Sequence, residues 1–117
     1  MHWTQDAAER IRSVAGVVDA SVVEGSDGLP GSRSFRAEVR LDSVADPTAT
    51  AQLLDALLEQ LHAAAVDDAP RGSVSLFQLQ DGIRKNCRAS RLPLPEGLRG
   101  WGSSVTVPEG WLHGRFA

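Results

Sequence analysis

The stretch from Phe35 to Asp42 constrains the fold of this chain more than any other. Four apolar residues alternate there with four charged ones: Phe35, Ala37, Val39 and Leu41 face one way, and Arg36, Glu38, Arg40 and Asp42 face the other. Successive side chains of a strand point to opposite faces of its sheet. The pattern therefore predicts a strand with one buried and one wet face. A solvated surface is the simpler interpretation of the charged face, and binding through it is the alternative.

A helix is expected near the start of the chain. Thr4 can act as its N-cap, and residues 5–15 carry apolar side chains at the i, i+3, i+4 and i+7 positions of one helical face. Gly16 is a natural terminator. The sequence thus predicts a helix that packs one side against the sheet.

Residues 17–24 change to a period of two. Val18, Ala20 and Val22 alternate with polar residues, which predicts a second strand. Residues 25–34 hold three glycines and a proline, and predict a loop between the two strands. That loop is either a hairpin tip or a binding loop.

A second helix is expected after Asp46, which can cap it, with Pro47 in its first position. It carries a broad leucine stripe, typical of a core-facing surface: Leu53, Leu54, Leu57, Leu58 and Leu61. Residues 67–72 are expected to end it.

Residues 73–81 predict a third strand that is apolar on both faces. Val74 and Leu76 point to one face, whereas Phe77 and Leu79 point to the other. A strand of this kind is usually covered on both sides. Part of the chain should therefore pack on the sheet face opposite the helices, at least near this strand.

The chain divides into two parts of opposite charge. Residues 1–81 carry 13 acidic and 6 basic side chains, and residues 82–117 carry 2 acidic and 6 basic ones. We interpret residues 1–81 as a compact α+β domain. Residues 82–117 form a basic extension that holds Trp101, Trp111 and Phe116, and we expect it to pack on the domain or on a partner. Residues 82–100 look irregular, and residues 103–107 predict a short strand.

These elements together predict the fold class. Helix, strand, strand, helix, strand describes an α+β two-layer sandwich in which two helices cover one face of a mainly antiparallel sheet. The expected arrangement is ferredoxin-like, in the order αββαβ. A further strand at residues 103–107 would extend it to a permuted αββαββ order.

Residues 7–80 resemble a known family. The segments IRSVAGVVDASVVEG, SFRAEVRLDSVADPTATAQLLDALLEQL and GSVSLFQLQ are similar to the cytoplasmic C-terminal domain of cation diffusion facilitators, with a helix ending in Gly-Val, two strands, a helix and a strand. The resemblance implies the ferredoxin-like fold and a pairing or interaction role. It carries over no metal site, because the histidines that would furnish one are largely missing, as is the Cys-x-x-Cys loop of the heavy-metal-associated domains.

Candidate chemistry is sparse, and we expect no catalytic, cofactor or metal site. The single cysteine, Cys87, excludes a disulfide framework and any multi-cysteine metal centre. The best grouping for a metal is His62 with Asp55 or Glu59, and an exposed or capping histidine is the simpler interpretation. Cys87 with His62 or His113 as its base would be an enzyme hypothesis, but no cysteine-enzyme motif surrounds it.

Composition also bears on partners and location. The net charge of −3 argues against a dedicated nucleic-acid binder, although residues 84–99 are basic enough to contact phosphates and Trp101 stands nearby. The longest apolar run, residues 63–66, is too short to span a bilayer, and no apolar stretch follows Met1. We therefore expect a cytoplasmic protein with no membrane segment.

The function favoured by these patterns is a non-enzymatic protein-interaction or assembly domain. Its partner is expected to be a protein, either a second copy in a homodimer or a larger assembly. A regulatory domain that senses a ligand or metal is the first alternative, and a nucleic-acid-contacting accessory protein is the second. The predicted partner-binding residues are those of the sheet face and the extension: Phe77, Leu79, Arg88, Arg91, Trp101, Trp111 and Phe116.

Overall fold

A computed structural model of the protein describes residues 3–25, 34–65 and 71–116. The predicted loop at residues 25–34 and the predicted helix end at residues 67–72 lie largely outside this part of the chain. The elements in chain order are α1 Trp3–Arg12, β1 Val17–Gly25, β2 Ser34–Leu41, α2 Pro47–Ala64, β3 Arg71–Gln80, β4 Ile83–Asn86, the 3₁₀ helix η1 Ala89–Arg91, β5 Arg99–Trp101, β6 Ser104–Val107 and α3 Trp111–Phe116.

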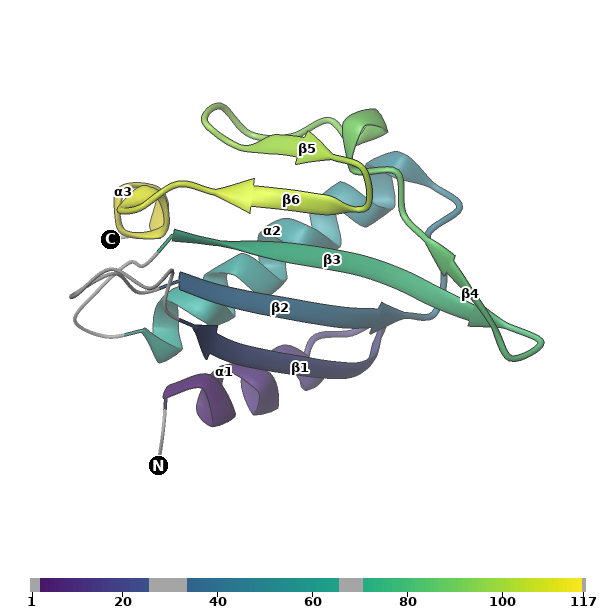
Figure 1. The fold of residues 1–117 in the computed structure, drawn as a ribbon, viewed down its shortest axis with the longest axis horizontal. Coiled ribbons are helices and arrows are strands. Elements are labelled where there is room, and N and C mark those ends of the chain that lie inside the picture. Colours follow the sequence, from purple (N-terminus) through teal and green to yellow (C-terminus); the bar gives the residue numbers. More distant parts are fainter. Residues whose placement is uncertain (1–2, 26–33, 66–70, 117) are drawn as a thin grey trace.

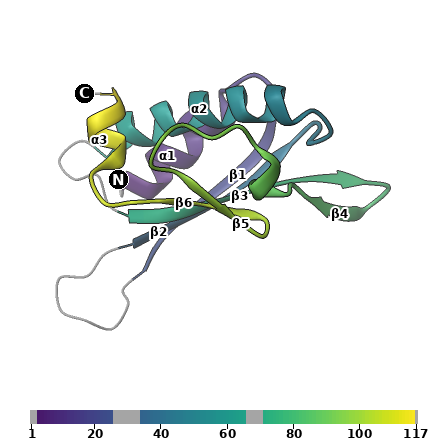
Figure 2. The ribbon, with the colours of Figure 1, turned by 90° about the horizontal axis from the view of Figure 1, so that it is seen from above.

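The strands form one mixed sheet with the order β1-β2-β3-β6-β5, and β4 pairs with the end of β3 (Figure 1). The helices lie on one side of this sheet (Figure 2), so the predicted α+β two-layer sandwich is confirmed. The ferredoxin-like strand order is not. That arrangement splits its βαβ units with an intervening strand, whereas β2 and β3 are direct parallel neighbours that pair Val39 with Leu76.

The hydrophobic core lies between the sheet and the helices, and both parts of the chain build it. Residues after 82 add seven buried side chains to the core cluster: Cys87, Ala89, Leu92, Leu98, Val105, Val107 and Leu112. Figure 2 shows the chain between η1 and β5 passing on the helical side of the sheet, as α3 does. The extension therefore completes the helical layer that α1 and α2 begin.

Helix α1 differs from its predicted bounds at both ends. It already includes Trp3 and Thr4, so Thr4 is not its N-cap. Thr4 is buried, while the Trp3 ring meets Phe35 edge-on and its indole N–H donates to Glu24. At the other end, the amide of Ser13 donates to the Arg10 carbonyl, three residues back. This tighter bonding ends the helix at Arg12, before the predicted end at Ala15.

Strand β1 confirms the predicted period of two, except at Val18. Ala20 and Val22 are buried as expected, but Val18 is 44% exposed. Val17 pairs with Leu41 and Asp19 pairs with Arg40, so a register shift leaves Val18 without an opposite residue on β2. An irregularity of this kind changes the direction of the side chains that precede it, so Val18 does not follow the alternation of the rest of the strand.

Helix α2 forms as predicted. The Asp46 carboxylate accepts from the amides of Thr48, at 3.0 Å, and Ala49, at 3.3 Å, and Pro47 occupies the first turn. Four of the five predicted leucines are buried, and Leu53 is partly buried. In the part of the chain that the structure describes, no helix combines the length and apolar character needed to cross a bilayer.

The expectation that residues 82–100 are irregular is wrong in two places, at β4 and at β5. The connection from β3 to β4 is a two-residue turn of Asp81, with φ of 52°, and Gly82, with φ of 78°. Positive φ at both central residues is the backbone of the tight hairpin turn that Asp-Gly favours. The turn folds Ile83–Asn86 back onto the end of β3, where Leu79 pairs with Arg84.

Gly72 is required by the packing of Phe35, and this predicts the effect of adding a methyl group. A Cβ on Gly72 would lie 2.3 Å from the Phe35 ring, whereas a Cβ on Gly25 would meet nothing within 4 Å. We expect Gly72→Ala to lower the free energy of unfolding by about 1–3 kcal/mol, as overpacking does. Gly25→Ala, the matched control, should change it by less than about 0.5 kcal/mol. Urea unfolding measures both, and equal midpoints would contradict the packing described.

Candidate functional site

The sheet face opposite the helices, named here the open face, carries the candidate site. Residues that pair across neighbouring strands point to the same face of the sheet, so each set of paired residues forms a row of side chains across the open face. Its members are Asp19, Ser21, Val23, Arg36, Glu38, Arg40, Ser73, Ser75, Phe77, Leu79, Arg84, Asn86, Arg99, Trp101, Ser104 and Thr106. Figure 2 shows no helix on this side among the described residues.

Arg84 covers the apolar centre of the open face. Its guanidinium carbon lies 4.0 Å from the centre of the Phe77 ring, and one terminal nitrogen lies 3.7 Å from Glu38. Its Nε donates to the Asn86 side chain at 2.7 Å. The arginine thus reaches from β4 over β3 to β2, and gives Phe77 the cover that its position on the second face of β3 requires.

Trp101 projects from the same face without such cover. It is 84% exposed, the most exposed of the large hydrophobic side chains that the structure describes. Trp101 lies on β5, opposite Ser104 of β6, and the Ser104 hydroxyl hydrogen-bonds the Ser75 hydroxyl across the strands at 2.8 Å. Because the side chains of Ser104 and Ser75 are short and polar, the indole extends beyond the neighbouring surface of the sheet.

The charge of the open face is positive once existing ion pairs are counted. Its two carboxylates are both engaged: Asp19 lies 3.1 Å from Arg12, and Glu38 lies near Arg84. Within the described residues, two arginines of this face, Arg36 and Arg99, form no hydrogen bond or ion pair, whereas Arg40 interacts electrostatically with Asp19, its opposite residue on β1. The face is therefore cationic although the whole chain carries −3.

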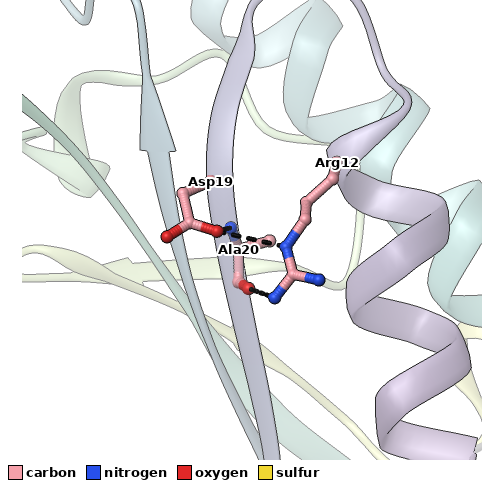
Figure 3. A network of polar contacts seen from close by, with 3 residues as sticks. All are labelled: Arg12, Asp19 and Ala20. Carbon is pink, nitrogen blue, oxygen red and sulfur yellow. Dashed lines mark hydrogen bonds and ion pairs between the residues drawn. The ribbon is translucent and has the colours of Figure 1, made fainter.

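The free edge of β1 is engaged by side chains at Ala20 (Figure 3). The Asp19 carboxylate accepts from the amide of Ala20 at 2.8 Å, and Arg12 donates to the Ala20 carbonyl at 2.8 Å. The Ala20 amide and the Arg12 guanidinium lower the pKa of Asp19 below its ordinary value. This network occupies backbone groups that would otherwise invite another strand.

Two other borders of the sheet are also unsuited to strand addition. The amide of Ala89 donates to the Gly102 carbonyl at 2.9 Å, and a Cβ on Gly100 would lie 2.4 Å from the Ala89 backbone. The η1 segment thus lies against β5. Strand β4 is only four residues long and carries Arg84 and Lys85, features that discourage edge pairing.

The structure groups the predicted partner-binding residues into three sets. Phe77, Leu79 and Trp101 share the open face, with Leu79 39% exposed. Arg88 and Arg91 are exposed on the segment that borders β5. Trp111 and Phe116 lie on α3, on the helical side. The predicted residues therefore do not form one surface.

The two aromatic side chains of α3 pack within the molecule. The Trp111 indole N–H donates to the Glu96 carbonyl at 2.9 Å, and its ring meets Phe116 edge-on at 6.2 Å. Phe116 in turn lies 5.9 Å from the His62 ring on α2. These contacts attach α3 to α2 and leave Trp101 as the tryptophan available to a partner.

The arginines and the glutamate of the open face are the site residues that the sequence prediction did not include. The alternation of residues 35–42 did place Arg36, Glu38 and Arg40 on an outer face, and we interpreted that face as solvated. Arg84 and Arg99 gave no such signal, because β4 and β5 were not expected. Their positions depend on pairings that only the folded sheet establishes.

The other candidate chemistry receives no geometric support within the described residues. Cys87 is buried, and burial raises the pKa of its thiol, the reverse of what an activated nucleophile needs. The His62 and His113 rings lie 5.7 Å apart, but no group of three potential metal ligands occurs in the described ranges. Asp55 is bound instead by Arg115, at 3.3 Å.

Comparisons of the chain with protein-family models, with curated proteins and with solved structures gave no match. They therefore do not bear on the resemblance to the cation diffusion facilitator domain, which stays a prediction. The function has to be argued from the open face itself.

The contact of Arg84 with Phe77 predicts a measurable loss on mutation. We expect Arg84→Ala to lower the free energy of unfolding by about 1 kcal/mol, because a cation–π contact and a half-exposed ion pair are both lost. Arg84→Lys should recover only part of it, since an ammonium lacks the planar stacking surface. Lys85→Ala, on the opposite side of β4, is the control. Chemical unfolding of all three variants provides the comparison, and equal losses for Arg84→Ala and Lys85→Ala would refute the contact.

Burial of Cys87 predicts low thiol reactivity. Iodoacetamide should alkylate the native protein at least tenfold more slowly than free cysteine at pH 8, because access is limited and the raised pKa keeps the thiol protonated. In denaturant the rate should reach that of free cysteine. Mass spectrometry follows the reaction, and native alkylation as fast as that of free cysteine would contradict this placement.

Proposed function

We propose that this protein is a small interaction domain that docks a protein partner on the open face around Trp101. The observation that carries the proposal is the position of Trp101, 84% exposed on a strand paired into the sheet. Tryptophan is among the residues that contribute most to binding at protein interfaces. An indole with no packing role in its own domain is the feature such an interface would use.

Trp101 is held rigidly enough to act as an anchor. Its strand pairs with β6, and Ala89 bonds to the Gly102 carbonyl on the adjoining turn at 2.9 Å. An anchor fixed by its backbone loses little conformational entropy when a partner binds. Val23, 54% exposed, and Leu79 extend the apolar contribution to other parts of the same face.

Docking on the face is favoured over addition of a strand at an edge. The backbone of β1 is engaged at Ala20 by Arg12 and Asp19, and the η1 segment lies against β5. These arrangements leave the open face as the broad surface without cover among the described residues.

A protein different from this chain is favoured over a second copy that meets it symmetrically. A two-fold contact brings the same patch of both copies together. Here it would place the arginines of one copy that have no partner, Arg36 and Arg99, in the same interface as those of the other. Like charges brought together in this way oppose association.

Selection from a phage-displayed library of random peptides tests the proposal without knowledge of the natural partner. We expect wild-type protein to enrich a consensus, and purified Trp101→Ser protein to bind those peptides at least tenfold more weakly. Ile83→Ser is the matched control: Ile83 is 72% exposed but lies at the hairpin tip on the other side of the sheet. Its affinity should match that of wild type.

The stability of the same variants completes the test. Trp101→Ser should unfold within about 0.5 kcal/mol of wild type, as expected for a surface substitution that touches no core. A selection without enrichment would overturn the proposal, as would a consensus that binds Trp101→Ser unchanged.

A further inference from the structure

We infer that the partner presents an extended acidic polypeptide segment to the open face, an inference that rests on the proposed function. The observation behind it is the position of two arginines without a partner, Arg36 and Arg99, at the two ends of one row of the face, with the exposed Trp101 two residues beyond Arg99. A segment with carboxylates beside an apolar side chain is complementary to this set.

The charges of the open face specify an anionic partner. Asp19 and Glu38 are bound by Arg12 and Arg84, and Asp19 also interacts with Arg40, so Arg36 and Arg99 are left without a carboxylate among the described residues. Arginine binds carboxylates through two parallel hydrogen bonds, which gives such pairs both strength and direction. Carboxylates supplied from outside would satisfy groups that the described residues leave unpaired.

The spacing of these groups suits an extended chain that crosses the strands. Arg36, Ser73, Thr106 and Arg99 form one row from β2 to β5. Three strand spacings of about 4.8 Å place the ends of this row about 14 Å apart at the backbone. Trp101 lies two residues beyond Arg99, roughly 7 Å further along β5. Carboxylates of one extended segment can therefore reach both arginines while an apolar neighbour contacts Trp101.

A hollow of about 600 Å³ adjoins the Arg36 end of this row. Apolar residues that line it include Val23, Phe35, Val107 and Pro108. The acidic residues Glu24 and Glu109 line it too, so the hollow suits an apolar side chain of the segment and not one of its carboxylates. Such a concavity accommodates an aliphatic side chain. The segment that fits the whole surface thus presents acidic and apolar side chains on the same side, which in an extended chain means residues two apart.

A polypeptide matches the surface better than a single-stranded nucleic acid does. Binders of single strands use several aromatic rings as stacking platforms, whereas Phe77 lies beneath Arg84 and only Trp101 stands exposed among the described aromatic residues of this face. Nucleic acid is therefore treated as an outcome of the test.

Fluorescence anisotropy with three labelled probes tests the inference. The probes are a dodecapeptide with the repeat Glu-Glu-Leu-Leu, which presents both residue types on each side of an extended chain, the same peptide with glutamine for glutamate, and an oligodeoxythymidine. The acidic peptide should bind wild type at least tenfold more tightly than its glutamine counterpart. Arg36→Gln and Arg99→Gln should each weaken it about tenfold, the magnitude of a lost charge-assisted hydrogen bond. Lys85→Gln, which removes a cation from the other side of β4, should leave it unchanged.

The outcomes separate this inference from the proposed function. Equal binding of the two peptides, or no binding of the acidic peptide up to millimolar concentration, would overturn the acidic partner. The proposed function would then still stand on Trp101-dependent peptides from the library. Oligodeoxythymidine bound more tightly than the acidic peptide, with the same dependence on Arg36 and Arg99, would overturn it in favour of nucleic acid. Circular dichroism and unfolding midpoints confirm that each variant is folded.

Discussion

The pairing of β3 is the interaction on which the rest of this structure depends. Residues on β3 pair with β2 in parallel, with β6 and with β4, so one strand joins the first part of the chain to the extension. Val74 and Leu76 anchor it in the core, and Phe77 anchors Arg84 on the other side. Without these pairings the helical layer and the open face would lack a common support.

Local patterns in the sequence predicted the elements whose determinants lie close together. The alternation that begins at Phe35 defined β2, and Asp46 with the leucine stripe defined α2. Contacts between residues distant in the sequence account for the features of the fold that were predicted incorrectly. No local pattern in the sequence indicates that β3 pairs with β2. Val18 was predicted to lie on the buried face, but a register shift that the alternating pattern does not reveal leaves it exposed. Thr4, expected as a cap, is buried instead.

The candidate site was predictable in outline but not in its members. The two-faced pattern of β3 predicted chain packed on the face opposite the helices, but the extension packs on the helical side and places a single side chain over Phe77. The covering group is an arginine, brought into place by the Asp81-Gly82 turn. The tryptophans of the extension were grouped by sequence proximity, yet Trp111 packs toward α2 and Trp101 projects from the sheet. Ten residues of chain are enough to carry two side chains to opposite layers.

The closed edge at Ala20 bears on the stoichiometry of any assembly. A sheet with an open edge can add copies without limit, since each added strand exposes a new edge. Here Arg12 and Asp19 occupy the backbone groups of Ala20 on that edge, and so hinder another strand from pairing there. Docking of a partner on the open face, as proposed, would then not be accompanied by growth of the sheet from this edge. The side-chain network would limit the size of the complex without taking part in the docking contact.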